Sequence, residues 1–220
     1  MKKVVVAVGN HFMSSIVNEK SNENRMTCWT CDENLSNDFF CSHCDSVQPL
    51  KENTSVFHYL GFEKTYSIDL AMLEKKYFDW QMRVHPDKFI GRSDEEKAVA
   101  SSHSAFVNQA YKILKDSYLR AEHLLIDKGE NIGHVSEFDA ILLEEVMEKQ
   151  ELLVTLDKKE AIQDFMEREQ NKINDLENEL SLHFASDDFD AVRRVLKFLK
   201  YSNKLLEDAR KQEKKISSSH

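Results

Sequence analysis

The chain has very little proline and glycine, only two and five residues respectively in a length of 220. Both residue types interrupt helices, so their scarcity, together with 31% charged residues, favours long solvated helices over sheets. Neither residue occurs after Gly133. Apolar runs of the roughly 20 residues needed to cross a bilayer are also lacking. We therefore predict a mainly α fold and no membrane partner.

The chain has fewer basic than acidic residues, 30 Lys and Arg against 39 Asp and Glu, and most of the excess acid lies in the C-terminal part. The formal net charge is -9, and residues 131–220 contain 14 Lys and Arg against 20 Asp and Glu. An acidic surface repels phosphate backbones, which disfavours nucleic acid as a partner. Basic or mixed protein surfaces remain compatible with this charge.

The N-terminal segment lacks the features of a secretory signal, because Val4–Val8 is short and β-branched. A mitochondrial presequence is rich in arginine and poor in acid, whereas this segment has lysines at its start and Glu19 and Glu23 later. We expect residues 1–26 to be a disordered or cleaved leader.

All four cysteines lie within a short segment as two CxxC pairs, Cys28 with Cys31 and Cys41 with Cys44. Two such turns facing each other make a tetrahedral sulfur cage suited to Zn²⁺. The segment is too short for an apolar core, so the metal would supply much of its folding energy. We predict a structural zinc site in residues 27–50.

Other interpretations of the cysteines are open to test. Disulfides are disfavoured because nothing indicates an oxidising compartment. Iron bound by the same four sulfurs remains an alternative, and His43 could compete as a ligand. Catalytic zinc is disfavoured, because four thiolates leave no position for water.

Two amphipathic stretches follow a short apolar element at residues 55–62, which Gly61 ends. Spacings of three and four predict two antiparallel helices that share a buried seam. The first helix would contribute Leu70, Leu73, Tyr77, Trp80 and Val84. The second would contribute Val99, His103, Phe106, Ala110 and Ile113 or Leu114, with His103 as a packed core residue.

His85-Pro86-Asp87 connects these two helices. Proline ends the first helix and favours an extended backbone at His85. Gly91 allows a turn, and Ser93 with Glu96 forms a capping-box pattern for the second helix. A proton-shuttling enzyme, such as a zinc hydrolase, is the alternative for the imidazole and carboxylate, but no nucleophile or phosphate-binding glycine loop accompanies them.

The tripeptide between two patterned helices resembles the signature of a J-domain, which we place at residues 55–130. The resemblance implies that the chain is not itself an enzyme but stimulates ATP hydrolysis by a DnaK/HscA-type chaperone. For exposed lysines, an ordinary solvated helix face is the alternative. The implied chaperone-binding residues are His85, Pro86, Asp87, Lys75, Lys76, Arg83 and Lys88.

We predict a three-helix bundle in residues 135–214. Its helices would lie at about 137–156, at about 158–184 and after Ser186-Asp187-Asp188, which can cap the third helix. On the first helix, one apolar flank lies off the main stripe and is bordered by acids. That flank either contacts a second neighbouring helix or forms an exposed ridge for a basic partner. Its residues are Leu143, Met147 and Val154, bordered by Glu144, Glu148 and Glu151.

Segments 108–111 and 120–125 resemble the extended J-domain of HscB-type co-chaperones of iron–sulfur cluster assembly, and the tetracysteine segment resembles animal-type members. The resemblance implies a location in the mitochondrial matrix, with the cytoplasm as the alternative. It also implies an IscU-type scaffold as partner. A general J-protein that self-associates through the bundle and serves another client is the second hypothesis. The implied scaffold-binding residues are Leu143, Met147, Glu148, Glu151 and Phe198.

Overall fold

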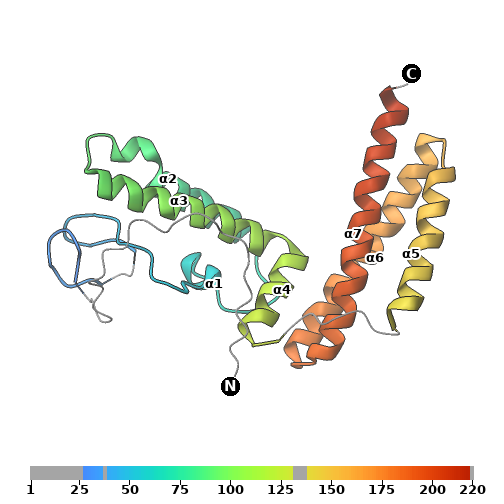
Figure 1. Cartoon of the computed structure of the whole chain (residues 1–220), viewed down its shortest axis with the longest axis horizontal. Coiled ribbons are helices and arrows are strands. Elements are labelled where there is room, and N and C mark those ends of the chain that lie inside the picture. The colour runs from blue at the N-terminus through green and yellow to red at the C-terminus, as the bar shows by residue number, and fades with distance from the viewer. Residues whose placement is uncertain (1–26, 37–38, 131–137, 219–220) are drawn as a thin grey trace. The chain divides into compact units, whose positions relative to one another are not determined.

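The computed structural model describes residues 27–36, 39–130 and 138–218, so the predicted leader at residues 1–26 lies outside it. The chain divides into two compact units, Met1–Pro49 and Leu50–His220. Within the described ranges the regular structure is helical, and pairing between extended segments is limited to two isolated bridges. The predicted mainly α fold is confirmed (Figure 1). No helix among these residues is long and apolar enough to span a membrane.

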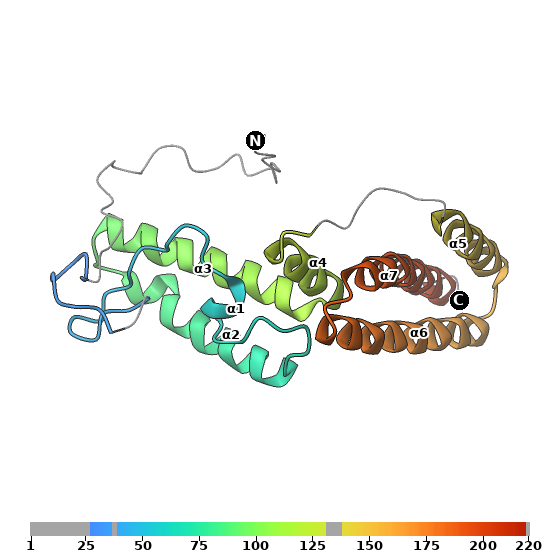
Figure 2. The same ribbon diagram turned by 90° about the horizontal axis from the view of Figure 1, so that it is seen from below.

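The second unit begins with a helical hairpin that a short helix supports. Helix α1 (Val56–Tyr59) precedes α2 (Leu70–Val84) and α3 (Asp94–Lys115), which lie side by side (Figures 1 and 2). Gly61 follows α1 with φ +68°, a conformation that glycine adopts without strain. Leu73 and Val84 are fully buried on α2, as the spacing predicted.

The predicted seam is wrong at several positions. Leu70 is 51% exposed, because it is the first residue of α2 and lies at the end of the hairpin. On α3, His103, Ala110 and Leu114 are buried as predicted. Ala100 and Val107 are buried in place of Val99 and Phe106, because α1 also packs on this helix and Phe106 faces Tyr59 of α1. The buried set on α3 is Ala100, His103, Val107, Ala110 and Leu114.

Helix α4 (Ser117–Asp127) extends the hairpin and begins immediately after α3. Asp116 caps it, because its carboxylate accepts the backbone N–H of Leu119 at 2.9 Å. The buried residues of α4 include Leu124 and Leu125, which pack on the rest of the unit. His123 is half-buried, with its ring centroid 6.3 Å from that of Phe57, so it packs against α1.

The remaining helices form the predicted bundle, α5 (Phe138–Thr155), α6 (Lys159–Ala185) and α7 (Phe189–Ser218). They run up, down and up, and α6 packs along α7 (Figures 1 and 2). Asp188 accepts the N–H of Ala191 at 3.0 Å near the start of α7, which confirms the predicted capping chemistry. Six residues along α6 face inward and are buried: Ile162, Phe165, Glu169, Ile173, Leu176 and Leu180.

Direct contacts join the hairpin side of this unit to the bundle. The ring of Tyr66 stacks on that of Phe184 with centroids 5.2 Å apart. Arg193 of α7 donates to the carboxylate of Glu130, after α4, at 2.7 Å. Aromatic stacking from the segment between α1 and α2, and an ion pair from the segment after α4, therefore hold the hairpin side against α6 and α7.

Candidate functional site

The loop at His85-Pro86-Asp87 interrupts the helical hairpin and presents two polar side chains. His85 ends α2 with φ -60° and ψ 133°, the extended conformation expected before proline. A short 3-10 turn, η1 (Pro86–Phe89), follows it. The chain then turns at Gly91, with φ +85°, and Ser93 and Glu96 form both hydrogen bonds of the predicted capping box.

The two polar side chains of the loop lie close together and face solvent. His85 Nδ1 accepts the backbone N–H of Asp87 at 3.3 Å and lies 3.6 Å from its carboxylate oxygen. The exposed fractions of the two side chains are 56% and 78%, and Lys88 is also exposed. This arrangement offers an imidazole and a carboxylate to another protein, with a backbone geometry that the loop itself maintains.

The four basic residues predicted to surround the loop do not share one environment. Lys75, Arg83 and Lys88 are exposed, and Arg83 lies over the Trp80 ring at 5.9 Å. Lys76 instead donates to the carbonyl oxygen of Gly61 at 2.7 Å. Its ammonium group therefore holds α2 against the segment after α1, and it is less available to a partner than the other three.

Sequence reasoning missed two exposed apolar residues on the same helix. Phe78 and Met82 are large but 55% and 60% exposed, and they lie seven and three residues before His85. Because Phe78 and Met82 are four residues apart, they share one face of α2, and this face differs from the one that carries the buried Leu73 and Val84. That spacing could have identified them. Lys75 lies three residues before Phe78 and shares this outer face.

The four cysteines form one sulfur cluster within the first unit. Their Sγ atoms all lie within 4.8 Å of one another. Cys28 and Cys44 have Sγ atoms 3.7 Å apart, and so do Cys31 and Cys41. Four sulfurs about 2.3 Å from one Zn²⁺ would be separated by about 3.8 Å, so these distances fit a tetrahedral site. The four side chains could thus hold a metal ion such as zinc.

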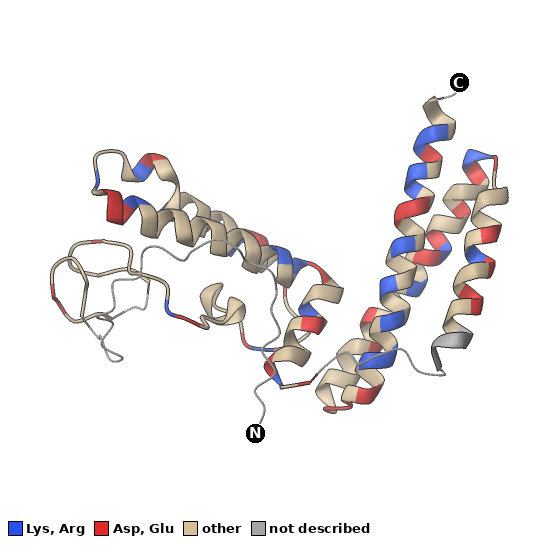
Figure 3. Cartoon of the chain, in the orientation of Figure 1, with Lys and Arg blue, Asp and Glu red and all other residues tan. Residues whose placement is uncertain are grey.

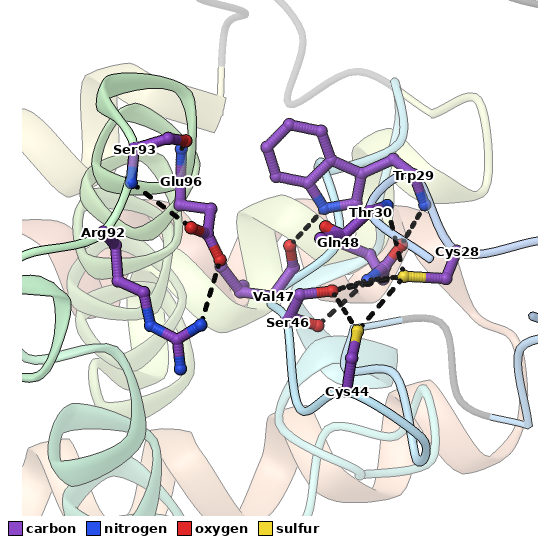
Figure 4. A network of polar contacts seen from close by, with 10 residues as sticks. All are labelled: Cys28, Trp29, Thr30, Cys44, Ser46, Val47, Gln48, Arg92, Ser93 and Glu96. Atoms are coloured by element: carbon purple, nitrogen blue, oxygen red, sulfur yellow. Dashed lines mark hydrogen bonds and ion pairs between the residues drawn. The ribbon is translucent and has the colours of Figure 1, made fainter. Parts of the chain in front are cut away.

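The two cysteine pairs have the same local backbone. Each pair ends in an aspartate with positive φ, Asp32 at 60° and Asp45 at 56°. The N–H of each aspartate donates to the carbonyl of the first cysteine in its pair at 3.0 Å. These matching turns direct the sulfurs inward from two separate parts of the segment. Trp29 N–H donors to Val47 and Gln48 tie the two parts together (Figure 4).

The surroundings of the sulfurs favour a thiolate at Cys28 and a thiol at Cys31. Burial raises the pKa of the Cys28 thiol, but hydrogen bonds, led by the one from Ser46, outweigh it and lower the pKa to about 5. A backbone hydrogen bond from Glu33 lowers the pKa of Cys31, yet burial and the neighbouring sulfurs raise it to about 12. A bound dication would offset the repulsion between neighbouring thiolates and so favour the deprotonated form of all four cysteines. Gln48 also donates to Cys28 Sγ at 3.3 Å, as a second-layer partner.

The alternatives for the cysteines can now be compared. All four are free, and a disulfide would need sulfurs about 2.05 Å apart. His43 is exposed and is not a member of the cluster, so four sulfurs fill a tetrahedral site without it. The ligand set does not discriminate zinc from iron, because both accept four thiolates.

On α5 the predicted apolar flank faces solvent and does not contact a second neighbour. Leu143 and Met147 are 53% and 52% exposed, and Val154 is 79% exposed. The bordering carboxylates are exposed as well, and acidic side chains recur along α5 (Figure 3). We refer to Leu143, Met147 and Val154 as the α5 ridge. Glu148 and Glu151 lie beside it.

Phe198 of α7 occupies a different environment from the α5 ridge. It is half-buried, and the ammonium group of Lys172 lies 5.4 Å from its ring centroid. It lines a hollow of about 340 Å³ between α6 and α7, together with Leu176 and Arg194. Phe198 and Leu142 of α5 both line a second, smaller hollow. Leu142 lies on the buried face of α5, which is distinct from the ridge. The five predicted scaffold-binding residues therefore divide between an exposed ridge and the margin of a hollow.

Comparisons with known proteins agree with this architecture. A sequence model described as the HSCB C-terminal oligomerisation domain matches residues 138–210. The chain is 30% identical over 186 residues to the iron-sulfur cluster co-chaperone protein HscB homolog of Arabidopsis thaliana, covering 84% of this chain and 73% of the relative. It is 28% identical over 186 residues to the iron-sulfur cluster co-chaperone protein HscB of Mus musculus, covering 82% and 80%. The crystal structure of human co-chaperone protein HscB is similar with a TM-score of 0.76 and 27% identity, covering 85% and 98%.

Proposed function

Because the chain belongs to the HscB family of iron–sulfur cluster co-chaperones, in its animal and plant type, we propose that it couples a chaperone to a cluster scaffold. In this proposal, residues 55–130 act as a J-domain that stimulates ATP hydrolysis by a DnaK/HscA-type chaperone. Residues 135–214 bind an IscU-type scaffold. The chain itself catalyses no reaction and acts by bringing two binding events together.

The geometry of the HPD loop supports the chaperone role and is the observation on which the proposal depends. His85 and Asp87 are exposed at a break between two packed helices, and their side chains contact each other's residue. A partner can therefore bind both groups without unfolding the hairpin. Lys75, Arg83 and Lys88 add positive charge near the loop, which would steer an acidic partner surface.

The α5 ridge supports the scaffold role. Exposed large apolar side chains bordered by charges are typical of protein–protein interaction sites. Leu143 and Met147 lie one turn apart, with Glu148 and Glu151 beside them, which suits a partner with apolar and basic groups. Phe198, half-buried at the margin of its hollow, would contribute a second contact from α7.

Further parts of the proposal concern the metal and the location. We assign zinc to Cys28, Cys31, Cys41 and Cys44, where it would cross-link residues 27–50. The four sulfurs leave no open position, so the metal stabilises the fold and takes no part in chemistry. The mitochondrial matrix is the proposed location.

The experiment that tests the function uses the full-length chain and a His85→Gln variant. Both should capture an IscU-type scaffold from the source cell, whereas only the wild type should stimulate ATP hydrolysis by the purified DnaK-type chaperone. His43→Gln, which changes an exposed histidine outside the loop, is the matched control and should stimulate normally. Full stimulation by His85→Gln would refute the proposed role of the loop.

A second candidate function is supported by one observation. The matching domain model is described as an oligomerisation domain, and the α5 ridge is exposed within it. The bundle could therefore join two copies of a general J-protein that serves another client. Sedimentation of the full-length chain distinguishes the candidates. A stable dimer that Met147→Ser dissociates supports the second one, and a monomer that binds the scaffold supports the first.

A further inference from the structure

Two buried polar side chains lie beside the four sulfurs of the first unit. Ser46 and Gln48 are each only 3% exposed. Burying a polar side chain is unfavourable unless it is hydrogen-bonded, so the partners of these two residues indicate why they are there. Their partners are the sulfurs themselves and the two CxxC turns that carry them, at residues 28–31 and 41–44 (Figure 4).

The side-chain amide of Gln48 joins the two CxxC turns. Its Oε1 atom accepts the backbone N–H of Trp29 at 3.2 Å, and its Nε2 atom donates to Cys28 Sγ at 3.3 Å, so both ends of the amide contact the first turn. The same Nε2 atom donates to the carbonyl and the hydroxyl oxygen of Ser46, directly after the second turn, at 2.9 Å each. Because none of these contacts involves a metal ligand bond, the amide can hold the turns together before a metal binds.

The hydroxyl of Ser46 lies between two sulfurs that belong to different turns. Its Oγ atom is 3.2 Å from Cys28 Sγ and 3.2 Å from Cys44 Sγ. When both cysteines are thiolates, their sulfurs can only accept, so the single hydroxyl hydrogen is directed towards this pair. Gln48 donates to the Ser46 oxygen, which leaves the hydroxyl hydrogen available to the sulfurs.

The charge of a loaded site explains why such donors matter. Four thiolates around one Zn²⁺ leave a net negative charge, and burial of that charge is unfavourable without hydrogen-bond donors. The backbone N–H two residues after the first cysteine of each pair donates to the sulfur of that cysteine at 3.4 Å. Ser46 and Gln48 add side-chain donors at Cys28 and Cys44, beyond what the two matching turns supply.

We propose that Gln48 and Ser46 are positioning residues of the metal site, which hold the two CxxC turns together and retain the metal by donating hydrogen bonds to Cys28 and Cys44. This inference rests on the proposed assignment of a metal to the four cysteines. Replacing a residue that hydrogen-bonds to a metal ligand commonly lowers metal affinity by about 10- to 100-fold. Retention of the metal should therefore depend on two residues that are not ligands.

Gln48→Glu separates the two roles of the amide. Glutamate has the same length and keeps an oxygen that can accept the N–H of Trp29, but it has no donor for Cys28 and places a second negative charge beside the thiolate. If the amide only connected the two turns, Gln48→Glu would behave as the wild type does. Ser46→Ala removes the hydroxyl alone and should have a smaller effect, because Gln48 still donates to Cys28.

The test measures the rate at which EDTA removes Zn²⁺ from the full-length chain at neutral pH. Gln48→Glu should release Zn²⁺ at least about tenfold faster than the wild type, and Ser46→Ala should release it faster by a smaller factor. Ser36→Ala is the matched control, because the Ser36 hydroxyl contacts that of Ser42 at 3.2 Å on the surface of the same segment. Its release rate should equal that of the wild type.

The absorption spectrum of Co²⁺ bound in place of Zn²⁺ distinguishes lost hydrogen bonds from a general disturbance of the fold. The charge-transfer band from thiolate to Co²⁺ lies at higher energy when donors stabilise the lone pairs of the sulfurs. The band should therefore move to longer wavelength in Gln48→Glu and in Ser46→Ala, and keep its position in Ser36→Ala. A variant that merely unfolds would lose the band without moving it.

Two results would overturn the inference while leaving the metal site intact. One is an equal rate of Zn²⁺ release in the wild type, Gln48→Glu and Ser36→Ala, and the other is an unmoved cobalt band in both Gln48→Glu and Ser46→Ala. If Gln48→Glu does not fold, Ser46→Ala decides the question, since it keeps the contacts of Gln48 with Trp29 and Cys28. A wild-type chain that binds neither Zn²⁺ nor Co²⁺ would refute the assigned metal site, and the inference would fail with it.

Discussion

The hydroxyl of Tyr59 lies 2.8 Å from Nδ1 of His103, and both side chains are buried between α1 and α3. Burial raises the pKa of Tyr59, so its hydroxyl stays protonated within this hydrogen bond. A phenol hydroxyl and an imidazole nitrogen can each donate or accept, so the tautomer of His103 sets the direction of this bond. Tyr59 also stacks on Trp80 of α2 with centroids 4.1 Å apart. One residue of the short α1 thus ties together both helices that present the HPD loop.

Tyr59→Phe should destabilise the chain by about 1–3 kcal/mol, because the buried His103 Nδ1 would lose its hydrogen bond with the Tyr59 hydroxyl. The ring stacking should survive, since phenylalanine has the same shape. Urea unfolding measures the change. Tyr111→Phe is the control, because the Tyr111 hydroxyl accepts a hydrogen bond from Lys115 at an exposed position. An equal loss of stability in both variants would contradict the special role of the buried pair.

The burial of His103 could be predicted from helical spacing, but its partner could not. Spacing within one helix indicates which residues face inward, and His103 is one of them. Tyr59 comes from a four-residue helix 44 positions earlier, where periodicity carries no information about distant contacts. The same limit explains the one-residue error on α3, because the prediction did not include the contact that α1 makes with that helix.

Cys41→Ser should remove the metal from the first unit, because three thiolates bind zinc far more weakly than four. Elemental analysis of the purified chain should find one zinc per wild-type molecule and a large loss in the variant. His43→Ala should retain the metal, since His43 is exposed and outside the cluster. Equal metal content in all three proteins would exclude the four-sulfur site, and iron in place of zinc would correct the assigned metal.

The α5–α6 ion pairs should make the bundle sensitive to acid. Hydrogen bonding to Lys172 lowers the pKa of Glu145 below its ordinary value of 4.5, although burial opposes this effect. A lowered carboxyl pKa stabilises the folded state above about pH 4.5, and this contribution disappears as the pH falls through the folded value. Glu145→Gln should therefore reduce stability at neutral pH, with a difference from wild type that shrinks below about pH 4.

Thermal unfolding across pH 3–8 checks this prediction. Glu144→Gln is the matched control, because Glu144 is an exposed carboxylate on the same helix. A parallel displacement of the Glu145→Gln curve at every pH would mean that the amide disturbs packing and that the ion pairs contribute little. Lys149 makes the stability of the bundle depend on pH at the alkaline end as well. Burial lowers its pKa, but hydrogen bonds, led by the one from Glu169, raise it overall, so its contribution is lost above about pH 10.5.

The inward face of α6 was predictable because a long helix that packs on one side has one apolar stripe. The candidate scaffold site was less predictable. Its members come from α5 and α7, and a helical wheel relates residues on one helix only. In the structure, Phe198 lies at the margin of a hollow, whereas Leu143 and Met147 are exposed. This separation changes how the site should be tested.

Leu143→Ala/Met147→Ala should weaken scaffold binding by about 2 kcal/mol or more, as expected for paired apolar anchors at an interface. Stability should change by no more than about 0.5 kcal/mol, because both side chains are already half exposed. Phe198→Ala should lower affinity and stability together, since its ring is half-buried against Lys172. Isothermal titration with the purified scaffold, alongside urea unfolding, separates these effects.

Leu182→Ala provides the reference for the α5 ridge, because Leu182 is 70% exposed on α6 and outside the proposed site. Affinity equal to wild type in both Leu182→Ala and Leu143→Ala/Met147→Ala would show that the scaffold does not bind the ridge. Stimulation of the chaperone ATPase in the absence of scaffold should persist in all of these variants, because the HPD loop is unchanged. Loss of that stimulation in the ridge variant would mean that the bundle contributes to chaperone docking, and that the two binding functions do not occupy separate surfaces.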